Sequence, residues 1–227
     1  MYILGIDTST NQISVALSAS GNVLGAITLE SGRKHAEHLP PAIAYLADAT
    51  AVGIPALTAI AVGTGPGLFT GLRVGITTAK VMAQTLRVPI IGVPSLDLLA
   101  YPVRTTPRLI AAVIDARRRE VFWALYRSVP GGIQRVCEYQ VGDPRDLANE
   151  LQAVGDDVLI VGEGGVRYRE CFAEVDRVEF AGPEHVTPSA SALVTLAAAR
   201  MEREAFSAVE EIVPLYLRES DAEIGVS

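Results

Sequence analysis

Two short motifs recur in the same order in the two halves of this chain, and this recurrence constrains the fold more than any other feature. An Ile-Asp pair followed at a fixed distance by an Ala-Leu pair occurs as Ile6-Asp7 with Ala16-Leu17, and again as Ile114-Asp115 with Ala124-Leu125. The second motif, Val62-Gly63-Thr64-Gly65, is echoed by Val161-Gly162-Glu163-Gly164. Two echoes in one order predict a duplicated domain, each copy opening with a strand that ends in an aspartate.

Strand patterns and helix patterns alternate along the chain. Short apolar or alternating runs predict strands at residues 2–6, 13–18, 23–29, 59–62, 90–93, 109–114, 121–126 and 158–161. Apolar residues spaced three and four apart predict helices near 39–49, 70–87, 147–154 and 189–204. The alternation is typical of an α/β protein. Residues 102–107 resemble a linker, so we expect an N-terminal lobe of 1–105 and a C-terminal lobe of 106–227. The last helix is able to pack back on the first lobe.

Composition excludes several classes of protein. Only 20% of the 227 residues are charged, which excludes disorder over most of the chain, and the net charge of −7 argues against a dedicated nucleic-acid binder. Two cysteines cannot build a disulfide framework or a four-ligand zinc site. The sequence contains no apolar run of about 18 residues and does not begin like a signal peptide. We therefore expect a soluble cytoplasmic protein.

Charge is distributed unevenly between the two halves. Residues 1–105 hold six basic and five acidic side chains, which is too few to cover an ordinary solvated surface well. Either a partner covers part of this half, or the half simply has an alanine-rich composition; the count alone does not decide between them.

Two turns carry candidate chemistry. Asp7-Thr8-Ser9-Thr10 follows the first strand, and Gly63-Thr64-Gly65-Pro66-Gly67 lies between a strand and a helix. Asp7, Thr8, Ser9, Gly65 and Gly67 are candidates for a weak nucleotide contact, since backbone amides at a helix start can meet an anion. The glycine block matches neither a P-loop nor a dinucleotide fingerprint. For Asp115, beside Arg117-Arg118-Arg119, we favour a cap on a solvated turn over a phosphate clamp.

A stripe of small residues runs along the helix expected at 70–87. Gly71, Gly75, Ala79 and Ala83 fall every four residues and invite close approach of another element. Packing against the chain's own sheet accounts for one helix face, but it does not easily account for the uncharged opposite face. His35 and His38 lack the carboxylate pattern of a zinc site, and no Ser/His/Asp set is identifiable.

Three segments resemble the TsaB (YeaZ) family of bacterial tRNA threonylcarbamoyladenosine biosynthesis subunits. They are Leu4-Gly5-Ile6-Asp7-Thr8-Ser9, Arg33-Lys34-His35-Ala36-Glu37-His38-Leu39-Pro40 and Gly65-Pro66-Gly67-Leu68-Phe69-Thr70-Gly71-Leu72-Arg73-Val74-Gly75. Shorter matches continue through Val93-Pro94-Ser95-Leu96, Ile114-Asp115-Ala116-Arg117 and Pro214-Leu215-Tyr216-Leu217-Arg218. The resemblance implies an actin-like, sugar-kinase-like (ASKHA, ribonuclease H-like) fold of two duplicated lobes.

The resemblance also implies a function. Members support the placing of a threonylcarbamoyl group on N6 of adenosine 37 in tRNAs that read codons beginning with A. The related catalytic subunit, TsaD, has a metal site built on two histidines, and Ser95 and Leu99 stand at the matching positions here. A serine and a leucine cannot replace two imidazoles. The resemblance therefore implies a pseudo-enzyme with no intrinsic cofactor, whose partner subunits carry the ATP and the metal.

Partners are implied by the same resemblance: TsaD, the ATPase TsaE, a second copy of the chain in the absence of TsaD, and tRNA only through the complex. The implied interface lies on low-charge helices of the first lobe, at Leu39, Ile43, Leu46, Leu72, Gly75, Ile76, Ala79 and Ala83. Gly75→Glu or Ala79→Glu is then expected to abolish partner binding while the lobe still folds. The main alternative is an M22-type glycoprotease-like peptidase, and the next is an ATP-dependent small-molecule kinase.

Overall fold

The computed structural model describes residues 1–218, which divide into two compact units. Unit 1 contains Met1–Leu98 and Pro188–Leu215, and unit 2 contains Leu99–Thr187 and residues 216–218. The first boundary falls seven residues before the expected one, and residues 188–215 return to unit 1, a placement that the sequence analysis allowed for the last helix. The return is explained by the last helix, which packs on β1 and β2 of the unit 1 sheet.

Unit 1 is built on a five-stranded sheet in the order β3-β2-β1-β4-β5. The strands are β1 (Tyr2–Asp7), β2 (Gln12–Ala19), β3 (Asn22–Glu30), β4 (Ala59–Gly63) and β5 (Ile90–Val93). The first three strands are antiparallel, and β4 and β5 run parallel to β1. The central strands β1 and β4 are buried almost throughout because helices cover both faces of the sheet.

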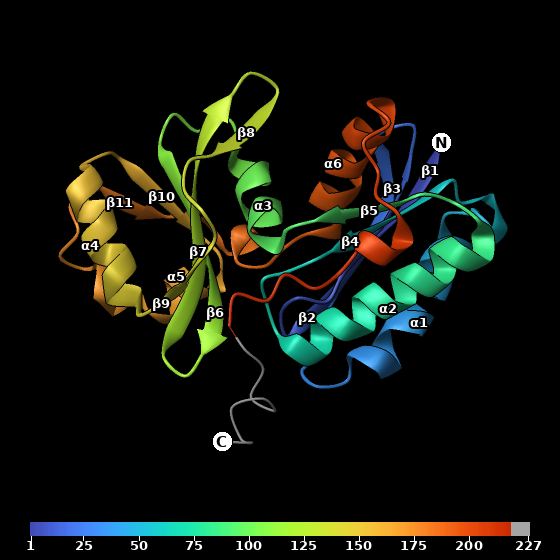
Figure 1. The fold of residues 1–227 in the computed structure, drawn as a ribbon, viewed down its shortest axis with the longest axis horizontal. Coiled ribbons are helices and arrows are strands. Elements are labelled where there is room, and N and C mark those ends of the chain that lie inside the picture. The colour runs from blue at the N-terminus through green and yellow to red at the C-terminus, as the bar shows by residue number, and fades with distance from the viewer. Residues whose placement is uncertain (219–227) are drawn as a thin grey trace. The chain divides into compact units, whose positions relative to one another are not determined.

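Three helices cover the unit 1 sheet. Helices α1 (His35–Ala49) and α2 (Phe69–Leu86) pack on one face, and α6 (Ala190–Glu202) lies on the opposite face, as Figure 1 shows. The backbone of Gly5 approaches α6 so closely that an added Cβ would lie 2.7 Å from Val194. Helix α1 begins four residues earlier than expected; its two prolines, Pro40 and Pro41, are exposed, so the carbonyl groups they leave unbonded can be hydrated.

Unit 2 repeats the same strand plan, with the order β8-β7-β6-β10-β11 and β9 added to β7. Its strands are β6 (Leu109–Arg117), β7 (Glu120–Val129), β8 (Gly132–Arg135), β9 (Gln140–Gly142), β10 (Val158–Val161) and β11 (Val178–Phe180). Its helices are α4 (Pro144–Val154) and α5 (Glu163–Arg167), and α3 (Ser95–Ala100) spans the boundary between the units. Asp7 ends β1 and Asp115 lies near the end of β6, as the sequence echoes predict.

Within residues 1–218, no helix is long and apolar enough to cross a membrane.

Candidate functional site

The glycine stripe of α2 packs inside unit 1, against the turn that follows β1. A Cβ added to Gly67 would lie 2.2 Å from the Ser9 carbonyl oxygen, and one added to Gly71 would lie 2.2 Å from the Thr8 carbonyl oxygen. A Cβ on Gly75 would lie 2.2 Å from Thr8 Oγ1, whose hydroxyl donates to the Gly71 carbonyl at 2.7 Å. Only glycine permits this contact. The stripe therefore serves packing within the chain.

The candidates for a nucleotide contact are enclosed by this packing. Asp7, Thr8, Ser9 and Thr10 are each at most 2% exposed. The Ser9 amide and hydroxyl both donate to Asp7 Oδ1, at 3.1 and 2.8 Å, and the Gly65 amide donates to Ser95 Oγ at 3.2 Å. The Ser9 and Gly65 groups proposed for a phosphate thus hydrogen-bond within unit 1, and Asp7, Thr8 and Ser9 are buried.

Burial raises the pKa of Asp7 from 3.8 to about 6, although hydrogen bonds from Ser9 and Ser95 oppose the rise. A folded-state pKa above the unfolded value favours the protonated form, so this group stabilises the fold below about pH 4. That stabilisation is lost as the pH rises through 6, and its full size is about 3 kcal/mol. The prediction is that Asp7→Asn raises the free energy of unfolding at pH 7.5 and flattens its pH dependence between about pH 4 and 6.

Urea unfolding at several pH values measures this effect. Asp48→Asn, on the exposed face of α1, is the matched control and is expected to leave the pH dependence unchanged. An Asp7→Asn protein that keeps the wild-type pH dependence would show that the pKa of Asp7 is the same in the folded and the unfolded chain.

The two positions that match the TsaD histidines do not fit a metal. The Ser95 amide donates to the Gly65 carbonyl at 2.6 Å, and Leu99 is a hydrocarbon side chain only 1% exposed. His35 Nε2 hydrogen-bonds to the Thr10 carbonyl at 2.8 Å, and His38 Nδ1 lies 3.2 Å from Ser31 Oγ. Among the described residues, no three His, Cys, Asp or Glu side chains are grouped to hold a metal ion.

The structure corrects the predicted partner-contact residues. All eight are buried, and seven of them belong to the apolar core under the unit 1 sheet: Leu39, Ile43, Leu46, Leu72, Ile76, Ala79 and Ala83. The eighth, Gly75, is buried against Thr8. The apolar spacing identified the correct helices but the wrong faces, because the periodic apolar face of a helix is the one that packs on its own sheet.

The outward faces of α1 and α2 form a shallow groove of about 500 Å³. We call it the α1–α2 groove; its lining residues are Ala36, Pro40, Phe69, Thr70, Arg73, Val74, Thr77 and Thr78. Arg73 is the only charged residue among them, and its guanidinium lies 3.9 Å from the centre of the Phe69 ring. Elsewhere on the same helices, Tyr45 of α1 is 68% exposed and Val81 of α2 is 56% exposed. An apolar, nearly uncharged surface of this kind is typical of a protein–protein contact.

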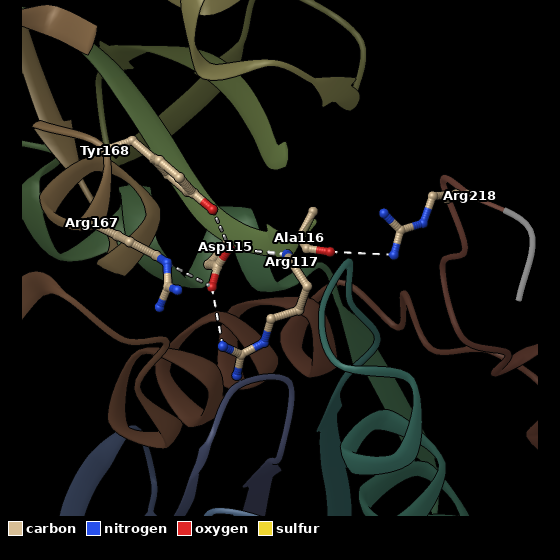
Figure 2. A network of polar contacts seen from close by, with 6 residues as sticks. All are labelled: Asp115, Ala116, Arg117, Arg167, Tyr168 and Arg218. Carbon is tan, nitrogen blue, oxygen red and sulfur yellow. Dashed lines mark hydrogen bonds and ion pairs between the residues drawn. The ribbon is translucent and has the colours of Figure 1, made fainter. Parts of the chain in front are cut away.

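Unit 2 carries a polar network around Asp115, shown in Figure 2. Asp115 Oδ1 accepts from the Arg117 amide at 3.0 Å and from the Tyr168 hydroxyl at 3.2 Å. Asp115 Oδ2 lies 3.3 Å from Arg117 NH1 and 3.5 Å from Arg167 Nε. Arg218 donates to the Ala116 carbonyl and pairs with Glu120. Asp115 thus caps the β6–β7 turn, as favoured from the sequence.

These two repeated units define an actin-like protein. The ROK hexokinase from Thermus thermophilus has a similar fold, with a TM-score of 0.51 over 86% of this chain and 98% of that chain. The two sequences are 13% identical, so the similarity concerns the fold alone.

Closer relatives identify the family. The profile "TsaD: tRNA N6-adenosine threonylcarbamoyltransferase" matches residues 19–226. The tRNA threonylcarbamoyladenosine biosynthesis protein TsaB of Escherichia coli (strain K12) is 32% identical, over 98% of this chain and 96% of that protein. The structure of YeaZ from Pseudomonas aeruginosa has a TM-score of 0.83 and 31% identity, covering 95% of this chain and 99% of that one. The chain belongs to the TsaB family.

Proposed function

We propose that this chain is a non-catalytic subunit in tRNA threonylcarbamoyladenosine biosynthesis. It docks a TsaD-type threonylcarbamoyltransferase through the α1–α2 groove and acts together with the ATPase TsaE. Without TsaD, two copies of the chain pair through the same face, and tRNA is engaged through the complex. The observation that carries the proposal is the groove itself, which is exposed and apolar and has one charged residue in its lining.

A partner of related fold suits this groove. The chain lies within the family whose profile is named for TsaD, so a TsaD-type partner is expected to present two equivalent helices. Two helices packed on two helices form a compact four-helix contact, and the same geometry allows pairing of identical copies. Phe69 and the exposed Tyr45 supply aromatic side chains of the kind that anchor such contacts.

The side chains at the candidate metal and nucleotide positions support a non-catalytic role. Ser95 and Leu99 offer no pair of metal-binding nitrogens, and Asp7, Thr8 and Ser9 are buried in unit 1, with Thr8 against the glycines of α2. We therefore assign the metal and the ATP to the partner subunits. An M22-type peptidase needs a metal or an activated nucleophile, and stoichiometric tightly bound zinc or iron in the purified chain would favour that alternative. ATP turnover by the isolated chain would favour the kinase alternative.

A transfer assay tests the proposal. Threonylcarbamoyl-adenylate and tRNA are supplied to this chain alone, to the organism's TsaD alone, and to both together with TsaE. We expect modification of tRNA only where this chain and TsaD are both present. Transfer by this chain alone would overturn the assignment of a non-catalytic role, and full transfer by TsaD and TsaE without it would show that the chain is not needed.

A further inference from the structure

The β6–β7 turn has an unusual backbone. Arg117, Arg118 and Arg119 follow one another with φ values of 65°, 54° and 64°, all in the left-handed region. Two-residue hairpin turns of this kind favour Asn-Gly, because the left-handed region brings Cβ too close to the following carbonyl oxygen in most other residues. Three arginines therefore occupy positions where Asn or Gly would stabilise the turn. Residues held in a disfavoured backbone conformation cluster at functional sites.

The charges in this turn are held in place. The buried Asp115 carboxylate, with a side chain 5% exposed, binds the Arg117 guanidinium and the Arg167 Nε at the same oxygen. Figure 2 shows both guanidinium groups approaching Asp115 Oδ2. The Arg167 side chain is still 58% exposed, and Arg118 and Arg119 are exposed as well. The Asp115 carboxylate thus orients the guanidinium groups of Arg117 and Arg167, and its single negative charge balances one of their two positive charges.

The local charge opposes that of the whole chain. The chain carries −7, yet four arginines gather here against the carboxylates of Asp115 and Glu163, and the neighbouring Glu120 is paired with Arg218. All but two of the chain's cationic residues are arginines, the exceptions being Lys34 and Lys80. A guanidinium presents a planar fork of donors that matches two phosphate oxygens. The half-buried Tyr168, beside Arg167, adds an aromatic ring to the patch.

We infer that Arg117, Arg118, Arg119 and Arg167 form a contact for the phosphodiester backbone of RNA, and that Asp115 positions it. This inference rests on the proposed function, since it gives unit 2 a direct part in holding the tRNA. Because the rest of the chain is acidic, the contact adds to RNA binding by the complex and supports only weak binding by the chain alone. Phosphate contacts of this kind fix position without reading sequence.

The sharpest test is the double variant Arg118→Asn with Arg119→Gly, which installs a preferred turn while removing two charges. We expect its Tm to rise, while its affinity for tRNA in the complex with TsaD falls about tenfold or more at about 0.1 M salt. The slope of log K against log salt is expected to fall by about 1.5. Arg145→Ala with Arg177→Ala removes the same charge from exposed positions elsewhere in unit 2 and is expected to leave affinity within about twofold.

Fluorescence anisotropy with labelled tRNA gives the affinities, for the complex and for the chain alone at low salt. Unchanged affinity in the turn variant, or an equal loss in the control variant, would overturn the inference. So would loss of TsaD binding by the turn variant, since the turn would then be a protein contact. A wild-type chain that fails to bind TsaD would refute the proposed function, and the RNA measurement on the chain alone would still test the turn.

Discussion

Thr77→Arg is expected to weaken binding of a TsaD-type partner at least about 100-fold, equal to roughly 3 kcal/mol. Thr77 is exposed in the lining of the α1–α2 groove, one helical turn from Arg73. A second guanidinium there would be desolvated beside a like charge when a partner covers the groove. Arginine is a good helix former, so the folded chain is expected to keep its stability. Isothermal titration calorimetry measures the affinity, and a thermal melt checks the fold.

The matched control is Thr85→Arg, the same change at an exposed position in the last turn of α2 and outside the groove lining. It is expected to bind the partner as the wild type does. Equal binding by Thr77→Arg and wild type would place the partner on another surface. Equal losses in both variants would mean that added positive charge, and not the groove, weakens binding.

Gly75→Ala is expected to lower the free energy of unfolding by several kcal/mol, and Gly75→Glu is expected to prevent unit 1 from folding. The new Cβ would lie 2.2 Å from Thr8 Oγ1, and that turn is buried under α2 and cannot move aside freely. The gain of about 1 kcal/mol in helix propensity is too small to compensate. This reverses the expectation from the sequence that Gly75→Glu leaves the lobe folded. Chemical denaturation measures the loss.

Gly53→Ala provides a control, since its Cβ would meet nothing closer than 3.7 Å and its φ of −63° suits alanine. It is expected to be neutral or slightly stabilising. The cost of Gly75→Ala is also expected to shrink in a Thr8→Ala background, where Oγ1 is absent. If that cost stays the same in both backgrounds, the contact with Thr8 does not explain the requirement for glycine.

The architecture could be predicted from the sequence because its strongest signals, the repeated motifs and the regular spacing of apolar residues, report directly on strands, helices and repeated units. The two motif echoes predicted repeated units, and the shared strand order of the two sheets confirms them. The positions of Asp7 and Asp115 at equivalent strand ends follow from the same echoes. Local sequence patterns do not predict which unit a helix joins when the chain returns to an earlier part of the fold. The sequence allowed the last helix to return to the first lobe but could not decide it, because the return of residues 188–215 depends on contacts between α6 and β1 that no local pattern encodes.

The candidate site was predicted only in part, for a related reason. Small and apolar residues at helical spacing show that one face of α2 is buried, but they do not show what buries it. Gly75 and Ala79 were assigned to a partner, whereas Thr8 and the core of unit 1 occupy that face. The residues left for a partner, such as Thr77 and Val81, are not periodic in hydrophobicity. Likewise, nothing in Arg117-Arg118-Arg119 encodes the left-handed backbone of the turn.

Hydrogen–deuterium exchange of this chain, with and without a TsaD-type partner, tests most directly whether the α1–α2 groove is the docking face. We predict that the partner slows exchange in peptides covering residues 36–45 and 69–81, with little change along β3, the edge strand beneath the inner face of α1. Unchanged exchange in both helices, with protection elsewhere on the chain, would contradict the account.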